Sequence, residues 1–115
     1  MAITIFHNPR CSKSRATLAL LEERGLAPEI RLYLQDPPDA AELTEILRLL
    51  GKSPRELMRR GEAEYREQGL ADESLDDNSL IDAMTATPRL IERPIVLANG
   101  KAAVGRPPES VLDIL

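Results

Sequence analysis

The sequence predicts an α/β domain in which a mixed sheet is flanked by helices. Two alternating apolar runs surround an amphipathic segment near the start, and an Asn-Gly pair separates two further apolar runs near the end. With 115 residues, 43% of them hydrophobic, the chain can bury roughly two-thirds of its unfolded surface in one core. We therefore expect a single domain over residues 1–115, with a helical insertion at about 39–88.

The first part of the chain is typical of a βαβ unit. Residues 3–6 form an alternating run that ends before Pro9, because proline cannot extend a strand ladder. A helix is expected from Ser12 to Gly25, a natural left-handed terminator. The alternation over residues 29–34 predicts a second strand. Strands joined through a helix should lie parallel in the sheet.

The middle of the chain is expected to be helical. Asp39 and Glu42 have the spacing of a capping box and precede an apolar stripe with helical period. Ser53 starts a second, short helix that should run to Gly61. A third helix is predicted after the polar run 76–79.

The last part of the chain predicts a hairpin followed by a helix. Residues 95–98 and 101–104 flank the pair Asn99-Gly100, which is the strongest signal for a two-residue hairpin. Residues 109–115 are expected to close the chain as a helix.

This order of elements, βαβ, a helical insertion and then ββα, is the thioredoxin-like arrangement. In that arrangement a reactive cysteine follows the first strand and opens the first helix, and Cys11 has this position. The Arg93–Pro94 bond is expected to be cis, because thioredoxin-like folds place such a bond where a proline leads the strand after the insertion.

Cys11 is the only cysteine, and its surroundings favour the thiolate. The positive end of a helix and nearby cations lower a thiol pKa, although the helix end alone is too weak for full ionisation at neutral pH. A dithiol oxidoreductase would carry a second cysteine where Ser14 stands, and a tyrosine-phosphatase cradle would need arginine in place of Thr17. Both familiar thiolate chemistries are therefore disfavoured.

Four further residues have two open interpretations each. Ser14 either donates a hydrogen bond to the sulfur or is a polar residue of the first helical turn. His7 either places an imidazolium beside the thiolate or is simply hydrogen-bonded at a strand end. Arg93 and Arg106 each precede a proline, which disfavours helix, and their guanidinium forks suit tetrahedral oxyanions; the alternative is an ordinary solvated arginine.

Composition excludes several other classes of function. The formal charge of −4 makes a nucleic-acid partner unexpected. No apolar run exceeds four residues, far short of the ~20 that cross a bilayer, and the N-terminal segment lacks the length and basic start of a signal peptide. A single cysteine in so short a chain argues against a disulfide-stapled secreted scaffold, so we expect a cytoplasmic location.

Taken together, these residues resemble the glutaredoxin-dependent arsenate reductase family, the one-cysteine class with a thioredoxin-like fold. The resemblance covers nearly the whole chain. It rests on His7-Asn8-Pro9-x-Cys11 with Ser14-Arg15, Tyr33-Leu34 before Pro37-Pro38, Arg59, Arg93-Pro94-Ile95-Val96, and Arg106-Pro107 before Val111-Leu112-Asp113-Ile114-Leu115. The best-known members continue with a charged tail, so this chain resembles a shorter branch.

The resemblance implies that Cys11 attacks the arsenic of arsenate and that glutathione then attacks the adduct. Glutaredoxin would remove the glutathione as a mixed disulfide, and arsenite would be the product. Assistance to the thiol is implied for His7 and Ser14. The residues implied to hold the oxyanion and its reduced product are Arg59, Arg93 and Arg106. No metal and no bound cofactor is implied; glutathione would be a cosubstrate, glutaredoxin a partner, and arsenate or another small oxyanion the substrate.

Two functions from other classes stay open. One is a non-catalytic regulator of a related type that binds RNA polymerase, although that type usually carries a second cysteine where Ser14 stands. The other is a monothiol glutaredoxin-like oxidoreductase, which the pattern Cys11-Ser12-Lys13-Ser14 permits.

Overall fold

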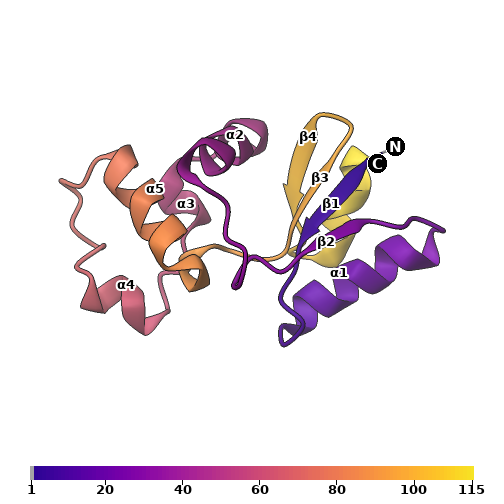
Figure 1. Cartoon of the computed structure of the whole chain (residues 1–115), viewed down its shortest axis with the longest axis horizontal. Helices are drawn as coiled ribbons and strands as arrows, with labels where there is room; N and C mark the ends of the chain where they lie inside the picture. The colour runs from indigo at the N-terminus through magenta and orange to yellow at the C-terminus, as the bar shows by residue number, and fades with distance from the viewer. Residues whose placement is uncertain (1) are drawn as a thin grey trace. The chain divides into compact units, whose positions relative to one another are not determined.

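The computed structural model describes residues 2–115 and has the α/β order that the sequence predicts. Its contacts divide the chain into two compact units (Figure 1). The sheet unit comprises the residues up to Asp36 together with Arg93–Leu115, and the helical unit is Pro37–Glu92. The expected helical segment at about 39–88 falls inside the helical unit. That the whole chain is one domain stays a prediction.

The sheet unit contains four strands and two helices. Its elements are β1 (Ile3–Phe6), α1 (Ser12–Glu23), β2 (Glu29–Arg31), β3 (Ile95–Ala98), β4 (Lys101–Val104) and the 3₁₀ helix η2 (Pro108–Ile114). The strand order is β2-β1-β3-β4. The prediction of parallel pairing is confirmed for β1 and β2, while β1–β3 and β3–β4 are antiparallel. The sheet is therefore mixed, as expected.

The register of the sheet brings together the segments that carry the candidate site. Phe6, the last residue of β1, pairs with Ile95, the first residue of β3. The loop after β1 and the segment before β3 therefore lie at the same end of the sheet. The hairpin turn is at the opposite end, where Asn99 and Gly100 have φ values of 56° and 70°, which confirms the predicted Asn-Gly turn.

One face of the sheet is covered by α1 and η2, which lie side by side in Figure 1. Apolar side chains from all of these elements form the core there: Ile3, Ile5, Leu21, Val96, Ala98, Val111 and Ile114. Burial of this cluster fixes α1 on the sheet and with it the position of the loop that leads into α1. The predicted C-terminal helix is confirmed: it is a 3₁₀ helix over Pro108–Ile114, close to the expected residues 109–115.

The second strand is shorter than its sequence pattern suggests. The expectation over residues 29–34 is wrong beyond Arg31, because the chain turns there: the N–H groups of Gln35 and Asp36 both donate to the carbonyl oxygen of Leu32. Leu32 and Leu34 consequently lie in a turn rather than in the sheet, and 37% and 39% of their surface is exposed.

The helical unit contains the short helices of the insertion. Its elements are α2 (Ala40–Leu50), α3 (Pro54–Leu57), α4 (Ala63–Glu67), α5 (Asp77–Ala86) and the 3₁₀ helix η1 (Pro88–Leu90). The capping box of α2 is confirmed, since Asp39 and Glu42 each accept from the other's backbone N–H. The helix that begins after Ser53 was expected to reach Gly61, but α3 ends at Leu57, because the extended Met58 pairs with Ile91.

Two X–Pro bonds in the sheet unit are cis. The bond Arg93–Pro94 is cis, as predicted, and the bond Arg106–Pro107 is a second one that was not predicted. None of the described helices has the length and apolar character needed to cross a bilayer.

Candidate active site

The loop between β1 and α1 places Cys11 at the start of the helix. Asn8 organises this loop, because its side-chain oxygen accepts from the N–H of Arg10 at 3.0 Å and its carbonyl oxygen accepts from the N–H of Cys11 at 3.0 Å. Cys11 is the N-cap residue of α1, with an extended backbone, and its side chain makes no capping hydrogen bond. The first N–H groups of α1 are therefore not taken by a capping side chain.

His7 and Ser14 are both buried and contact one another. The Nδ1 atom of His7 lies 2.6 Å from the Oγ atom of Ser14, and the N–H of Asn8 donates to the same Oγ at 3.0 Å. Burial lowers the pKa of His7 and the charge of Arg15 lowers it further, while Glu22 opposes them. The lowered pKa favours the neutral ring, and the contact with Ser14 agrees with the hydrogen-bonded interpretation of His7. The Ser14 hydroxyl thus bonds to His7 and Asn8, the two residues that directly follow β1.

Two arginines reach the cysteine from the segments that flank the hairpin. The Nη2 atom of Arg106 donates to the Sγ atom of Cys11 at 3.9 Å, and its Nε donates to the carbonyl oxygen of Arg93 at 2.8 Å. The Nε and Nη1 atoms of Arg93 are buried. The N–H of Gly105 donates to the carbonyl oxygen of Pro94 at 2.9 Å, which ties the two segments together. Both arginines predicted from the Arg-Pro pairs are therefore part of one site with the thiol.

The surroundings of Cys11 favour the charged form of its thiol. Burial of the side chain raises the pKa, but the backbone N–H of Ser14, the charge and hydrogen bond of Arg93, and the backbone N–H of Lys13 outweigh it. The net effect is a pKa below the ordinary value of a cysteine. Ser14 thus acts on the sulfur through its backbone N–H, while its hydroxyl contacts His7 and Asn8.

Replacing Arg93 by methionine, which keeps an unbranched apolar stem and removes the charged guanidinium, is expected to raise the pKa of Cys11. The pH midpoint of iodoacetamide labelling measures this pKa, and in the wild type it should lie below that of a free thiol. Arg24→Gln is the matched control, because Arg24 is an exposed residue after the other end of α1. An unchanged midpoint in Arg93→Met would contradict this account of the thiolate.

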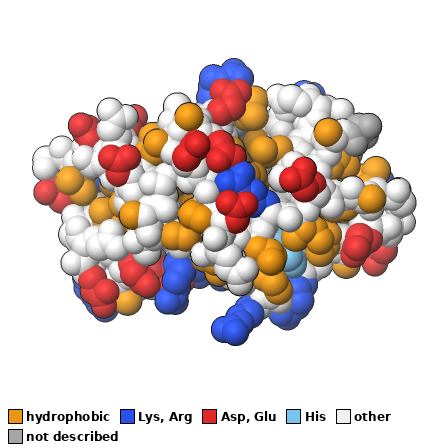
Figure 2. Space-filling view, viewed as in Figure 1, with side chains coloured by type: hydrophobic (Ala, Val, Ile, Leu, Met, Phe, Trp, Pro, Cys, Tyr) orange, Lys and Arg blue, Asp and Glu red, His pale blue; other side chains and the backbone are white. Residues whose placement is uncertain are grey.

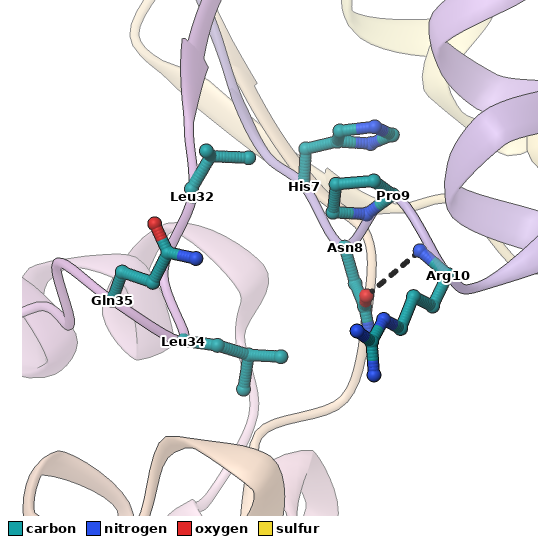
Figure 3. Close-up of a pocket in the computed structure, with 7 residues that line it drawn as sticks. All are labelled: His7, Asn8, Pro9, Arg10, Leu32, Leu34 and Gln35. Carbon is teal, nitrogen blue, oxygen red and sulfur yellow. Dashed lines mark hydrogen bonds between the residues drawn. The ribbon is translucent and has the colours of Figure 1, made fainter.

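A pocket of about 310 Å³ opens beside the loop that carries Cys11 (Figure 3). One wall is formed by the loop before the cysteine and the other by the turn after β2. The residues that line it are His7, Asn8, Pro9, Arg10, Leu32, Leu34 and Gln35. On the face drawn in Figure 2, hydrophobic side chains come to the surface around the pale-blue histidine, with basic side chains below them. No pattern in the sequence indicated this pocket.

Arg59 is the predicted site residue that lies in the helical unit. Its guanidinium is paired with the carboxylate of Glu62, and its Nη1 atom donates to the carbonyl oxygen of Arg89 at 3.4 Å. Its backbone N–H donates to Leu90 at 2.7 Å, which fixes the chain at this position. The role implied for Arg59 stays a prediction. Within residues 2–115, no three His, Cys, Asp or Glu side chains are grouped so that they could hold a metal ion.

Comparison with known proteins places this site in a family. A model of the ArsC family matches residues 6–114. The protein YfgD of Escherichia coli K12, which is described as uncharacterized, is 59% identical over 114 residues, or 98% of this chain and 96% of that protein. An arsenate reductase of Neisseria meningitidis serogroup A is 56% identical over 114 residues, or 98% of this chain and 97% of that protein.

A solved structure agrees with these relatives. The arsenate reductase from Vibrio cholerae has a TM-score of 0.98 and 51% identity to this chain, over 100% of this chain and 98% of the other. The resemblance based on the cysteine, arginine and proline motifs is thereby confirmed: the chain belongs to the ArsC family.

Proposed function

We propose that this protein reduces arsenate to arsenite, with Cys11 as the nucleophile and glutathione and glutaredoxin as the source of electrons. The observation that carries the proposal is the contact between Cys11 and Arg106, in which a sulfur with a lowered pKa lies 3.9 Å from a guanidinium nitrogen. A nucleophile and a group that binds oxyanions are thus within reach of the same tetrahedral substrate. Relatives named arsenate reductase, at 56% and 47% identity, support arsenate as that substrate.

The reaction balances with two thiols. The Cys11 thiolate forms a sulfur–arsenic bond and displaces one arsenate oxygen, which leaves as water after protonation. Glutathione then supplies the second sulfur, so that Cys11 and glutathione end as one mixed disulfide. Arsenic takes up the two electrons that the sulfurs lose and leaves as arsenite. A glutaredoxin thiol attacks the glutathione sulfur and returns Cys11 to its thiol form.

The second sulfur has to come from outside this chain, because Cys11 is its only cysteine. Glutathione is small enough to reach an adduct at the start of a helix, and glutaredoxin resolves mixed disulfides that contain glutathione. This chemistry belongs in a reducing compartment, and we propose the cytoplasm.

The basic side chains have the remaining roles in the proposed cycle. Arg93 and Arg106 would hold the arsenate oxygens and stabilise the charge that develops on them, because a guanidinium fork offers paired hydrogen bonds to such a group. Arg59 would contribute to the same task. His7 and Ser14 would position the loop through their mutual contact, since the serine hydroxyl also accepts from the N–H of Asn8.

Arsenite formation with defined thiol donors tests the proposal. We expect many turnovers when glutathione, glutaredoxin and glutathione reductase are all present, and at most one turnover per cysteine without glutaredoxin. Turnover at the same rate with thioredoxin and its reductase, in the absence of glutathione, would contradict the proposed donor. Exchange of glutathione disulfides without any arsenite would instead indicate a monothiol glutaredoxin-like activity, and binding to RNA polymerase without turnover would indicate a regulator.

A further inference from the structure

The pocket beside the Cys11 loop has no role in the chemistry described so far. Its lining does not include Cys11, Arg93 or Arg106, so it is not the oxyanion site itself. It lies within the sheet unit, between residues 7–10 and the turn after β2. Arg10 lines the pocket and is covalently bonded to Cys11, so their Cα atoms are about 3.8 Å apart. The pocket therefore borders the residue that directly precedes the nucleophile.

The lining of the pocket combines a cation with apolar side chains. Leu32 and Leu34 project from the turn after β2 toward the loop, and Arg10 turns back beside Asn8 (Figure 3). None of the lining residues is acidic. Within residues 2–115, the guanidinium of Arg10 pairs with no carboxylate; only its backbone N–H is engaged, by Asn8. The pocket thus presents an available positive charge beside exposed leucines.

A pocket lined by a cation and apolar side chains suits a small peptide with carboxylates better than an inorganic oxyanion. A tetrahedral inorganic oxyanion has no apolar part to cover Leu32, Leu34 and Pro9. A small peptide with free carboxylates has methylene groups for the leucines, a carboxylate for Arg10, and amides that the side chain of Gln35 can pair with. A volume of about 310 Å³ is at the lower end of the range for small-molecule sites.

We propose that this pocket binds the body of glutathione and delivers its thiol to the arsenic adduct on Cys11. The inference rests on the proposed function, because it names the place where the cosubstrate of that reaction binds. An extended tripeptide spans roughly 10 Å, so a carboxylate held by Arg10 leaves the thiol within reach of the neighbouring cysteine. No bond changes in this binding step, and the thiol reacts as in the cycle above.

Binding is tested directly with S-methylglutathione, a thioether that cannot react. Titration into the wild-type protein, followed by methyl NMR, should shift the signals of Leu32 and Leu34 in a saturable way. Arg10→Gln should weaken this binding about fivefold or more, because it removes a charge-assisted hydrogen bond at a partly exposed site. Arg24→Gln is the control with the same change of charge at the other end of α1, and it should bind like the wild type.

Kinetics give an independent readout. In arsenite formation, Arg10→Gln and Leu34→Ser should raise the KM for glutathione about fivefold or more and leave the KM for arsenate unchanged. The pH midpoint of Cys11 labelling should also stay in place, because Arg10 is not among the groups that shift the pKa of this thiol. An unchanged KM for glutathione in both variants, or an increased KM for glutaredoxin alone, would overturn the proposal.

The two proposals can fail separately. If the wild-type protein forms no arsenite while S-methylglutathione still shifts Leu32 and Leu34, the glutathione site stands and the arsenate reductase function is wrong. If arsenite forms with glutathione but S-methylglutathione shifts only signals away from the pocket, the function stands and the site is wrong.

Discussion

Cys11→Ser is expected to form no detectable arsenite, even with glutathione and glutaredoxin in excess. The hydroxyl that replaces the thiol cannot form a disulfide with a second sulfur. The variant therefore cannot supply the two electrons that reduce arsenate to arsenite. Removal of a covalent nucleophile from another enzyme costs on the order of 10⁶-fold in kcat, which sets the scale of the loss. Single-turnover arsenite formation, measured with enzyme in excess over arsenate, gives the sharpest comparison with the wild type.

The serine variant should keep its fold, since the change is nearly isosteric and Cys11 lies outside the apolar cluster that packs α1 on the sheet. Its thermal midpoint is the check, and Ser12→Ala, one residue further along the chain, is the matched control that should retain activity. Arsenite formation by Cys11→Ser at more than about a hundredth of the wild-type rate would mean that the thiol of Cys11 is not the nucleophile.

Gly105→Ala is expected to destabilise the protein by about 1–3 kcal/mol through overpacking. A Cβ atom at this position would lie 2.5 Å from the Oγ1 atom of Thr17 and 2.8 Å from the Cγ atom of Pro94. Neither neighbour can move easily, because Thr17 is buried in α1 with its hydroxyl bonded to the carbonyl oxygen of Lys13, and Pro94 is fully buried. Denaturant unfolding measures the loss, and arsenite formation should fall with it because Arg106 follows Gly105 directly.

Gly61→Ala provides the matched control for this steric argument. A Cβ atom at Gly61 meets nothing within 4 Å, so its effect should stay within about 0.5 kcal/mol. The double variant Gly105→Ala with Thr17→Ala should be less destabilised than the sum of the two single variants, because the second change removes the Oγ1 and Cγ2 atoms of Thr17 that the new Cβ atom would approach. Equal stability of Gly105→Ala and the wild type would show that α1 can shift away from the hairpin.

The helix starts and turns that depend only on neighbouring residues were predictable from the sequence. The capping box at Asp39 and the turn at Asn99-Gly100 satisfy local hydrogen bonds and backbone angles, so neighbouring residues decide them. The end of α3 was not predictable, because Met58 leaves the helix to pair with Ile91, more than thirty residues away in the chain. The alternation through Leu34 is equally compatible with a strand and with the turn that forms.

In the candidate site, too, the features set by neighbouring residues were predictable, and those that depend on distant parts of the chain were not. The position of Cys11 at the helix start follows from strand and helix signals on either side of it, and the prolines after Arg93 and Arg106 mark both arginines. The partner of the Ser14 hydroxyl could not be inferred, because it depends on where β1 places the ring of His7. The pocket was missed because it is formed by the loop before Cys11 and a turn that the sequence presents as a strand.

The N-cap position of Cys11 also bears on the end of the proposed cycle. There the sulfur of Cys11 is no longer the nucleophile but the leaving group, expelled when glutaredoxin attacks the glutathione sulfur. A thiol with a low pKa departs faster from a disulfide, since the charge it carries away is better stabilised. The amides of Ser14 and Lys13 and the guanidinium of Arg93 lower the pKa of Cys11. In the proposed cycle they would therefore also direct the glutaredoxin thiol to the glutathione sulfur and favour release of Cys11.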